Sequence, residues 1–263
     1  MERLVRDGVN LYYTDQGTGD PPLLFVHGWC CNSSHFQPQV DFFSRDHRCI
    51  AVDLRGHGES DKPEQDYTMA VFADDLAWLC EQLGVLKPVV IGHSMGGVVA
   101  LALAQRHPDI PAALVLVDSP VLVPGALKLQ IEQVIAGLKT PAFREVARGL
   151  VENAMFLPTS DPALKERIVG GMAGAPQQVM VSAMEQIFAF DSEAALAACR
   201  VPLLNLSAAV PLVDTARLRK LRPEVVTGQT VGSGHFIQLE VPDQVNAMLA
   251  RFLETSVRSA AAV

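Results

Sequence analysis

The stretch VVIGHSMGGVVA, residues 89–100, places a serine between glycines where a short apolar run meets a small-residue run with helical character. The pattern from Gly92 through Ser94 to Gly96 is typical of a sharp turn from a strand into a helix, where Cβ atoms at the glycines would clash. Such a turn pushes the serine hydroxyl clear of the sheet and points a helix N-terminus at the reacting atom. A bare G-x-S-x-G also occurs by chance in glycine-rich connections. The flanking strand and helix, with Gly97 allowing close packing, therefore carry the prediction that Ser94 is a nucleophile.

The composition is that of a globular protein with a sizeable core. The chain has 263 residues, of which 49% are apolar and 19% charged, and one α/β domain with an insertion fits this length. The net charge of −8, the pI near 5.3 and the lack of any Lys and Arg cluster argue against nucleic acid or an anionic membrane as partner. We expect an uncharged or weakly polar small molecule as the partner, and a homodimer is left open.

Cysteine usage and the first residues indicate the compartment. The five cysteines form an odd set without zinc-type spacing, and the adjacent Cys30 and Cys31 rarely pair with each other. We expect free, buried thiols. The start MERLVRDGVNLYYTDQG is charged and alternating, with no signal-peptide core and no apolar run long enough to span a bilayer. The sequence therefore predicts a cytoplasmic protein.

Strand and helix patterns alternate over the first 120 residues. Residues 2–14 read as two short strands joined by a turn at Asp7-Gly8, and apolar helical spacing predicts a helix over residues 67–83. Continuous apolar runs predict buried strands over residues 23–26, 49–52, 89–92 and 113–117. This alternation predicts a parallel sheet covered on both faces by helices.

The alternation stops between residues 121 and 199. Prolines and glycines divide this segment into several short helices without a convincing strand. Strands resume over residues 201–206 and 225–230, a helix follows over residues 242–253, and the last ten residues are expected to fray. We expect a core of residues 1–120 and 200–263, with residues 121–199 as a helical lid on the sheet.

A serine hydroxyl needs an adjacent base to act as a nucleophile. Of the seven histidines, His235 lies on the glycine-rich stretch GSGHF after a predicted strand, so its ring should reach the edge of the sheet near Ser94. His35, His47 and His107 read instead as structural or solvated residues. We therefore predict His235 as the general base.

An oxyanion needs backbone donors. The N–H of Met95, at the start of the helix after Ser94, offers one. Gly28 turns the backbone after the 23–26 strand toward the nucleophile, so the N–H of Trp29 is assigned as the second. The alternative is that the Trp29 side chain is a plain core residue, which is compatible with a donor role for its backbone N–H. We expect His27 to brace this loop by hydrogen bonds.

Together these motifs resemble the α/β-hydrolase superfamily over nearly the whole chain. They are HGW at residues 27–29, DLRGHGES at 53–60, GHSMGG at 92–97, and GHF at 234–236 before EVP at 240–242. The resemblance implies a mostly parallel central sheet with helices on both faces and a helical lid insertion. It points to the branch of carboxylesterases, lactonases, C–C bond hydrolases and haloperoxidase-like enzymes, which need no cofactor. Within residues 53–60 we expect Asp53, Arg55 and His57 to make internal polar contacts and not to bind a metal.

The resemblance also implies a carboxylate that orients the histidine, and here the sequence departs from the pattern. In relatives this Asp follows the 201–206 strand, but the chain reads SAAVP at residues 207–211, with Val210, or Ala208 in a shifted register, at that place. Asp118 lies 24 residues after Ser94, a placement similar to that in haloalkane dehalogenases and some lipases. Asp214 is the second candidate, although it could be the N-cap of a helix over residues 215–221. We favour Asp118, and an acid-free dyad is the third alternative.

The lid region is rich in flexible and aromatic apolar side chains: Met155, Phe156, Met172, Met180, Met184, Phe188 and Phe190. They suit a pocket for a modest hydrophobic group, although each could simply pack the lid on the sheet. No lid Lys or Arg is clearly placed to clamp an anion. The sequence thus predicts a serine hydrolase that cleaves small, neutral, fairly hydrophobic carboxylic esters through an acyl-enzyme. The alternatives are a lactonase, C–C bond hydrolase or perhydrolase, or a ligand-sensing homologue with slow turnover.

Overall fold

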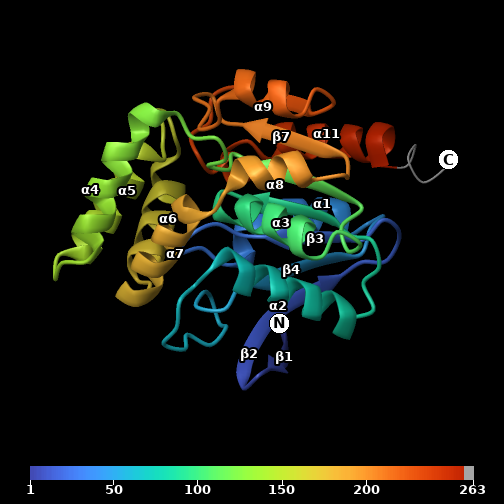
Figure 1. Ribbon diagram of the computed structural model, residues 1–263, viewed down its shortest axis with the longest axis horizontal. Coiled ribbons are helices and arrows are strands. Elements are labelled where there is room, and N and C mark those ends of the chain that lie inside the picture. Colours follow the sequence, from blue (N-terminus) through green and yellow to red (C-terminus); the bar gives the residue numbers. More distant parts are fainter. Residues whose placement is uncertain (258–263) are drawn as a thin grey trace.

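An eight-stranded sheet runs through the computed structural model, which describes residues 1–257 (Figure 1). The strand order is β1-β2-β4-β3-β5-β6-β7-β8. β2 pairs antiparallel with β1 and β4, and all other neighbouring strands are parallel. The strands are β1 (Glu2–Arg6), β2 (Val9–Gln16), β3 (Leu23–Val26), β4 (Cys49–Asp53), β5 (Val89–His93), β6 (Ala113–Val117), β7 (Leu203–Ser207) and β8 (Val226–Gln229).

Alternate residues of the central strands face two separate cores. In β5, Val90 packs into the core that holds α2, α3 and α8, whereas Val89 and Ile91 pack into the core that holds α1 and α11. These helices are α1 (Gln37–Phe43), α2 (Met69–Gln82), α3 (Met95–Arg106), α8 (Ser192–Ala198) and α11 (Pro242–Phe252). The predicted fold class, a mostly parallel sheet with helices on both faces, is confirmed.

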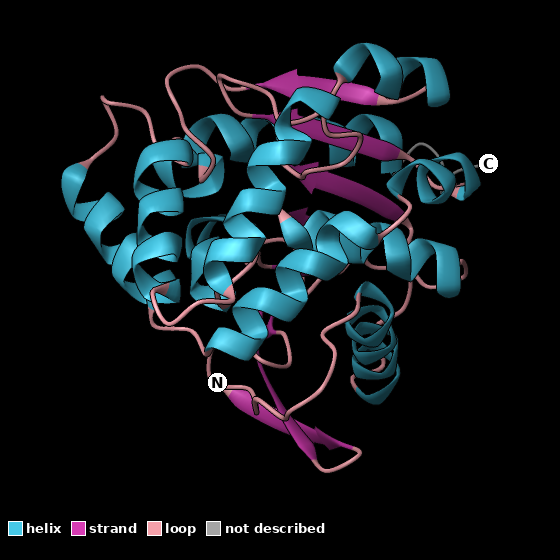
Figure 2. Ribbon diagram, turned by 60° about the vertical axis from the view of Figure 1, so that its left-hand side comes forward, coloured by secondary structure: helices cyan, strands magenta, loops and turns pink. Residues whose placement is uncertain are grey.

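The chain between β6 and β7 is helical wherever the structure describes regular elements. It forms η2 (Gly125–Leu127), α4 (Lys128–Leu138), α5 (Phe143–Ala154), α6 (Pro162–Ala173), α7 (Gln177–Ala189) and then α8. Figures 1 and 2 show α4–α7 gathered at the edge of the sheet toward which the parallel strands point. We call residues 121–199 the helical insertion.

Several short elements escaped the sequence patterns. They are η1 (Ser33–Phe36), α1, α10 (Ile237–Glu240) and a π-helical turn, η3 (Leu253–Val257). Because Leu253 and Val257 are buried in the second core, the prediction of fraying is wrong for residues 254–257. Its remainder, residues 258–263, lies outside the described residues. The helix α9 (Thr215–Leu221) lies where the sequence places it.

The position of the site follows from the order of the strands. β3 and β5 are neighbours, but the chain leaves β3 toward α1 on one face and leaves β5 toward α3 on the other. Loops that part in this way leave a crevice at the carboxyl ends of the strands, where α/β proteins bind ligands. None of the described helices is both long and apolar enough to cross a membrane.

Candidate active site

Ser94 occupies the turn between β5 and α3 in a strained conformation. Its φ of 52° and ψ of −119° lie where residues with a side chain rarely occur. A Cβ at Gly92 would overlap the carbonyl of Gly96, and one at Gly96 would overlap the carbonyl of Val26. The glycines therefore let the turn fold onto itself and onto β3, which leaves the Ser94 side chain facing the cavity.

His235 and Asp118 form a hydrogen-bonded pair beside this turn. The Nδ1 of His235 donates to Oδ2 of Asp118 at 2.7 Å, and both side chains are buried. The other carboxylate oxygen, Oδ1, accepts from the backbone N–H of Ala208 at 2.9 Å. With Nδ1 used as the donor, the Nε2 of His235 is left as a proton acceptor.

Of the two carboxylates proposed from the sequence, the structure brings Asp118 and not Asp214 to His235. Asp214 is exposed and caps α9, where its side chain accepts from the N–H of Arg217 at 3.0 Å. Val210, at the place expected for an acid, is 73% exposed. Ala208, the shifted alternative, contributes only its backbone N–H, and it does so to Asp118.

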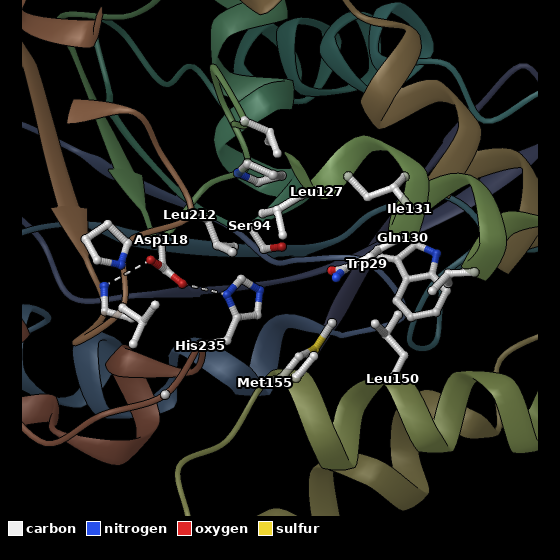
Figure 3. Close-up of a pocket in the computed structure, with 18 of the residues that line it drawn as sticks. Trp29, Ser94, Asp118, Leu127, Gln130, Ile131, Leu150, Met155, Leu212 and His235 are labelled. Atoms are coloured by element: carbon white, nitrogen blue, oxygen red, sulfur yellow. Dashed lines mark hydrogen bonds and ion pairs between the residues drawn. The ribbon is translucent and has the colours of Figure 1, made fainter. Parts of the chain in front are cut away.

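A cavity of about 450 Å³ opens beside these groups, between the carboxyl end of the sheet and the helical insertion. Ser94, His235 and Asp118 lie in its wall (Figure 3). Across residues 1–257 the structure has no hydrogen bond between the Ser94 hydroxyl and the His235 ring, and in unliganded enzymes such bonds are often long or poorly aligned. Figure 3 shows both groups directed at the same space.

Most of the remaining wall is apolar. It includes Trp29, Pro120, Val123, Leu127, Ile131, Val134, Leu150, Ala154, Met155, Phe156, Leu157, Met184, Ile187, Phe188, Val210, Pro211 and Leu212. Gln130 and Ser233 add uncharged polar groups, and none of the lining residues that the structure describes is a Lys or Arg. Four of the seven apolar insertion residues named from the sequence thus line the cavity, whereas Met172, Met180 and Phe190 do not. Gln130 was missed because nothing in its surroundings on α4 marks it.

The two predicted oxyanion donors lie on loops that meet at Ser94. A Cβ on Gly28 would stand only 3.1 Å from the Cβ of Ser94, so the loop after β3 passes directly against the turn. Trp29 follows, with a buried side chain whose indole N–H donates to the carbonyl of Met180 on α7 at 2.9 Å. Met95 is the first residue of α3, where a backbone N–H has no acceptor inside its own helix.

The histidines and carboxylates around the site brace its loops. His27 donates through Nδ1 to the carbonyl of Gly28 at 2.8 Å and accepts through Nε2 from the N–H of Leu54 at 3.0 Å, which confirms its bracing contacts. Burial lowers the pKa of His27 well below its ordinary value, so it stays neutral.

The predicted internal contacts of residues 53–60 are also present. Asp53 accepts from the N–H groups of Ser33 and Glu59, and Arg55 pairs with the buried Asp75. His57 donates to the carbonyl of Arg55, and burial lowers its pKa to about 4.

The cysteines are free and buried, as expected from the sequence. Burial raises the pKa of Cys49 and of Cys80 to about 12. Thiols held in this neutral form are poor nucleophiles and metal ligands. Within residues 1–257 no cluster of three or more His, Cys, Asp or Glu side chains is arranged to hold a metal ion.

Comparisons with known proteins agree with this geometry. A family model described as the alpha/beta hydrolase fold matches residues 21–161. A bifunctional esterase/perhydrolase from Acinetobacter calcoaceticus is 35% identical over 150 residues, which are 56% of this chain and 53% of that protein, so the match spans about half of the relative's length. A 2-(acetamidomethylene)succinate hydrolase from Mesorhizobium japonicum is 27% identical over 260 residues, covering 94% of this chain and 92% of that protein.

A solved structure extends the likeness to almost every residue. A thermophilic esterase from Thermogutta terrifontis, with malate bound, superposes with a TM-score of 0.85 at 26% identity and covers 98% of this chain and 100% of its own. The family model covers more than half of the chain, and the sheet and the serine turn have the form that the sequence motifs predicted. The chain therefore belongs to the alpha/beta hydrolase fold family.

Proposed function

We propose that this protein is a serine hydrolase that cleaves small, neutral, fairly hydrophobic carboxylic esters through an acyl-enzyme. The observation that carries the proposal is the 2.7 Å hydrogen bond between Nδ1 of His235 and Oδ2 of Asp118. Both side chains line one apolar cavity together with Ser94. A serine turn alone would be a structural feature. A turn whose neighbour is an imidazole held in one tautomer by a buried carboxylate is equipped for proton transfer.

In the proposed mechanism, Ser94 attacks the ester carbonyl while Nε2 of His235 takes the hydroxyl proton. Asp118 holds the ring and stabilises the imidazolium that forms. The N–H groups of Trp29 and Met95 donate to the oxyanion. His235 then gives its proton to the leaving alcohol, and a water that it activates clears the acyl-enzyme by the same steps.

The substrate class follows from the cavity wall. An anionic or cationic group placed there would lose its hydration without gaining an opposite charge, because the described side chains of the wall beside the catalytic pair are aliphatic, aromatic or polar and uncharged. Neutral esters with apolar acyl or alcohol groups avoid this penalty. The helical insertion supplies much of this wall, and we propose that it acts as the lid of the site.

The relatives support the reaction class and leave room for a second use of the acyl-enzyme. The Acinetobacter relative is named an esterase and a perhydrolase, and peroxide in place of water would give perhydrolysis without any further residue. A ligand-sensing role rested on the altered loop after β7. Because Asp118 compensates for that loop, turnover is the better-supported reading.

The test is hydrolysis of p-nitrophenyl acetate, butyrate and octanoate, with p-nitrophenyl succinate as the charged comparison. Wild type should hydrolyse the neutral esters and discriminate against the anionic one, and Ser94→Ala should retain almost no activity. Equal turnover by wild type and Ser94→Ala would contradict the proposal. A preference for the succinate would contradict the substrate class and leave the nucleophile in place.

A further inference from the structure

The loop that carries His235 is held by the helical insertion. The backbone N–H of His235 donates to the carbonyl of Met155, just beyond the end of α5, at 2.7 Å. The adjacent rings of Phe156 and Phe236 stack with centroids 5.3 Å apart. A Cβ on Gly234 would stand 2.5 Å from the Met155 carbonyl, so only glycine permits this approach. The α5–α6 connection therefore fits tightly against the loop of the general base.

A side-chain hydrogen bond joins the same two segments, the α5–α6 connection and the His235 loop. The hydroxyl of Ser160 donates to Oε2 of Glu240 at 2.5 Å, across 80 residues of sequence. The Oγ of Ser160 also accepts from the N–H of Leu157 at 3.0 Å, which fixes its direction within the connection. Glu240 ends α10, the single helical turn that begins two residues after His235. Backbone, ring and carboxylate contacts thus join residues 155–160 to residues 234–240.

The state of Glu240 argues against a purely stabilising role. Its second oxygen, Oε1, is buried and has no hydrogen-bond partner in the described part of the chain. A carboxylate oxygen that is shielded from water and left unpaired costs free energy that an apolar side chain would not, so stability alone does not explain a carboxylate at this partly buried position. What the carboxylate adds is direction, because it accepts one short hydrogen bond from one defined hydroxyl.

The three polar atoms of His235 that do not face the cavity are each held by a different element. The insertion holds the N–H, the His93 ring donates to the carbonyl at 3.1 Å, and Asp118 binds Nδ1. Only Nε2 is left to meet Ser94. A shift of the 155–160 connection would therefore move His235 relative to both Asp118 and Ser94.

We propose that Ser160 and Glu240 are positioning residues, whose hydrogen bond holds the α5–α6 connection against the His235 loop and so places the general base. This inference rests on the proposed function for its kinetic readout. It also makes the helical insertion part of the catalytic geometry, besides forming the cavity wall. Displacement of a catalytic group by about 1 Å can lower a rate by up to about a hundredfold.

The kinetic experiment compares Ser160→Ala, Glu240→Leu and their double variant on p-nitrophenyl butyrate. Ser160→Ala should lower kcat by about tenfold because the base is misplaced, with a smaller change in KM because Ser160 itself does not line the cavity. Ser160→Thr, which keeps the hydroxyl, should restore the rate. Thr159→Ala removes an exposed hydroxyl from the same connection and is the matched control, expected to match wild type. The double variant should be no slower than Glu240→Leu alone, because both changes break one contact.

A second measurement does not depend on turnover. The downfield proton resonance of the His235–Asp118 hydrogen bond should shift or broaden in Ser160→Ala and stay unchanged in Thr159→Ala, with circular dichroism confirming that each variant is folded. A wild-type kcat and resonance in Ser160→Ala, or additive losses in the double variant, would overturn the inference. If wild type hydrolyses no ester and the resonance still responds to Ser160→Ala, the proposed function fails while the positioning role stands.

Discussion

The carboxylate that binds the His235 ring follows β6 and not β7. Asp118 directly follows β6 and has a φ of 44°, a conformation that Asp tolerates better than most residues. Its N–H donates to the carbonyl of Leu206 and its side chain accepts from the N–H of Ala208, so it is tied to β7, the strand whose loop lacks an acid. The backbone of that loop thus orients a carboxylate supplied by the neighbouring strand.

Replacing Asp118 by Asn should lower kcat by about three to four orders of magnitude, because the amide favours the wrong tautomer of His235. Asp214→Ala is the control. It should leave kcat unchanged and reduce the free energy of unfolding by about 1 kcal/mol through the lost N-cap of α9. Steady-state kinetics and urea unfolding of both variants measure these effects. A large loss of kcat in Asp214→Ala with none in Asp118→Asn would reverse the assignment.

The close packing of the helix α3 against β3 and β5 determines the position of Ser94. The helix begins so close to the sheet that the carbonyl of Val26 occupies the place where a Cβ of Gly96 would be. Gly170, on the exposed side of α6, has open space around the same position. A change from glycine to alanine is therefore expected to have opposite effects on stability at positions 96 and 170.

Gly96→Ala should lower the free energy of unfolding by more than about 2 kcal/mol, since a rigid backbone group must move. Gly170→Ala should raise it by about 0.5–1 kcal/mol, the ordinary gain of alanine over glycine inside a helix. Chemical denaturation of both variants measures this. A neutral Gly96→Ala would mean that α3 does not press on β3 as the structure has it.

At the scale of the whole molecule, buried neutral histidines link stability to pH. Burial lowers the pKa of His35 and of His57 from 6.5 to about 4, and lowers those of His27 and His93 as well. Between pH 6.5 and 4 the unfolded chain binds protons at these side chains and the folded chain does not. These histidines therefore do not reduce the free energy of unfolding above about pH 6.5, and the free energy of unfolding falls as the pH is lowered from 6.5 toward 4.

His57→Gln should flatten this pH dependence. A shift from 6.5 to about 4 corresponds to about 3 kcal/mol, at about 1.4 kcal/mol per pKa unit. The variant should thus lose less stability than wild type between pH 7 and pH 4, even if it is less stable at pH 7. Urea unfolding at steps of one pH unit gives both curves, and parallel curves would contradict the role of His57.

The parts of the molecule that the sequence predicts are those set by local chemistry. The apolar runs predicted the central strands, and the glycines around Ser94 predicted the turn into α3, because each of these signals lies within a few residues. The choice between Asp118 and Asp214 stayed open, because it depends on which carboxylate reaches the His235 ring, 117 residues beyond Asp118. The helix α1 was missed because QPQVDFF is too short and mixed to show a period, and the Ser160–Glu240 contact has no local signal.

In the proposed mechanism, Ser94 is the residue acylated during turnover. Mass spectrometry of protein quenched in the first turnovers with p-nitrophenyl butyrate tests it directly. A butyryl group is expected on the wild-type peptide that contains Ser94, and none on the corresponding peptide of Ser94→Ala. Butyrylation at another residue, or undiminished hydrolysis by Ser94→Ala, would contradict it.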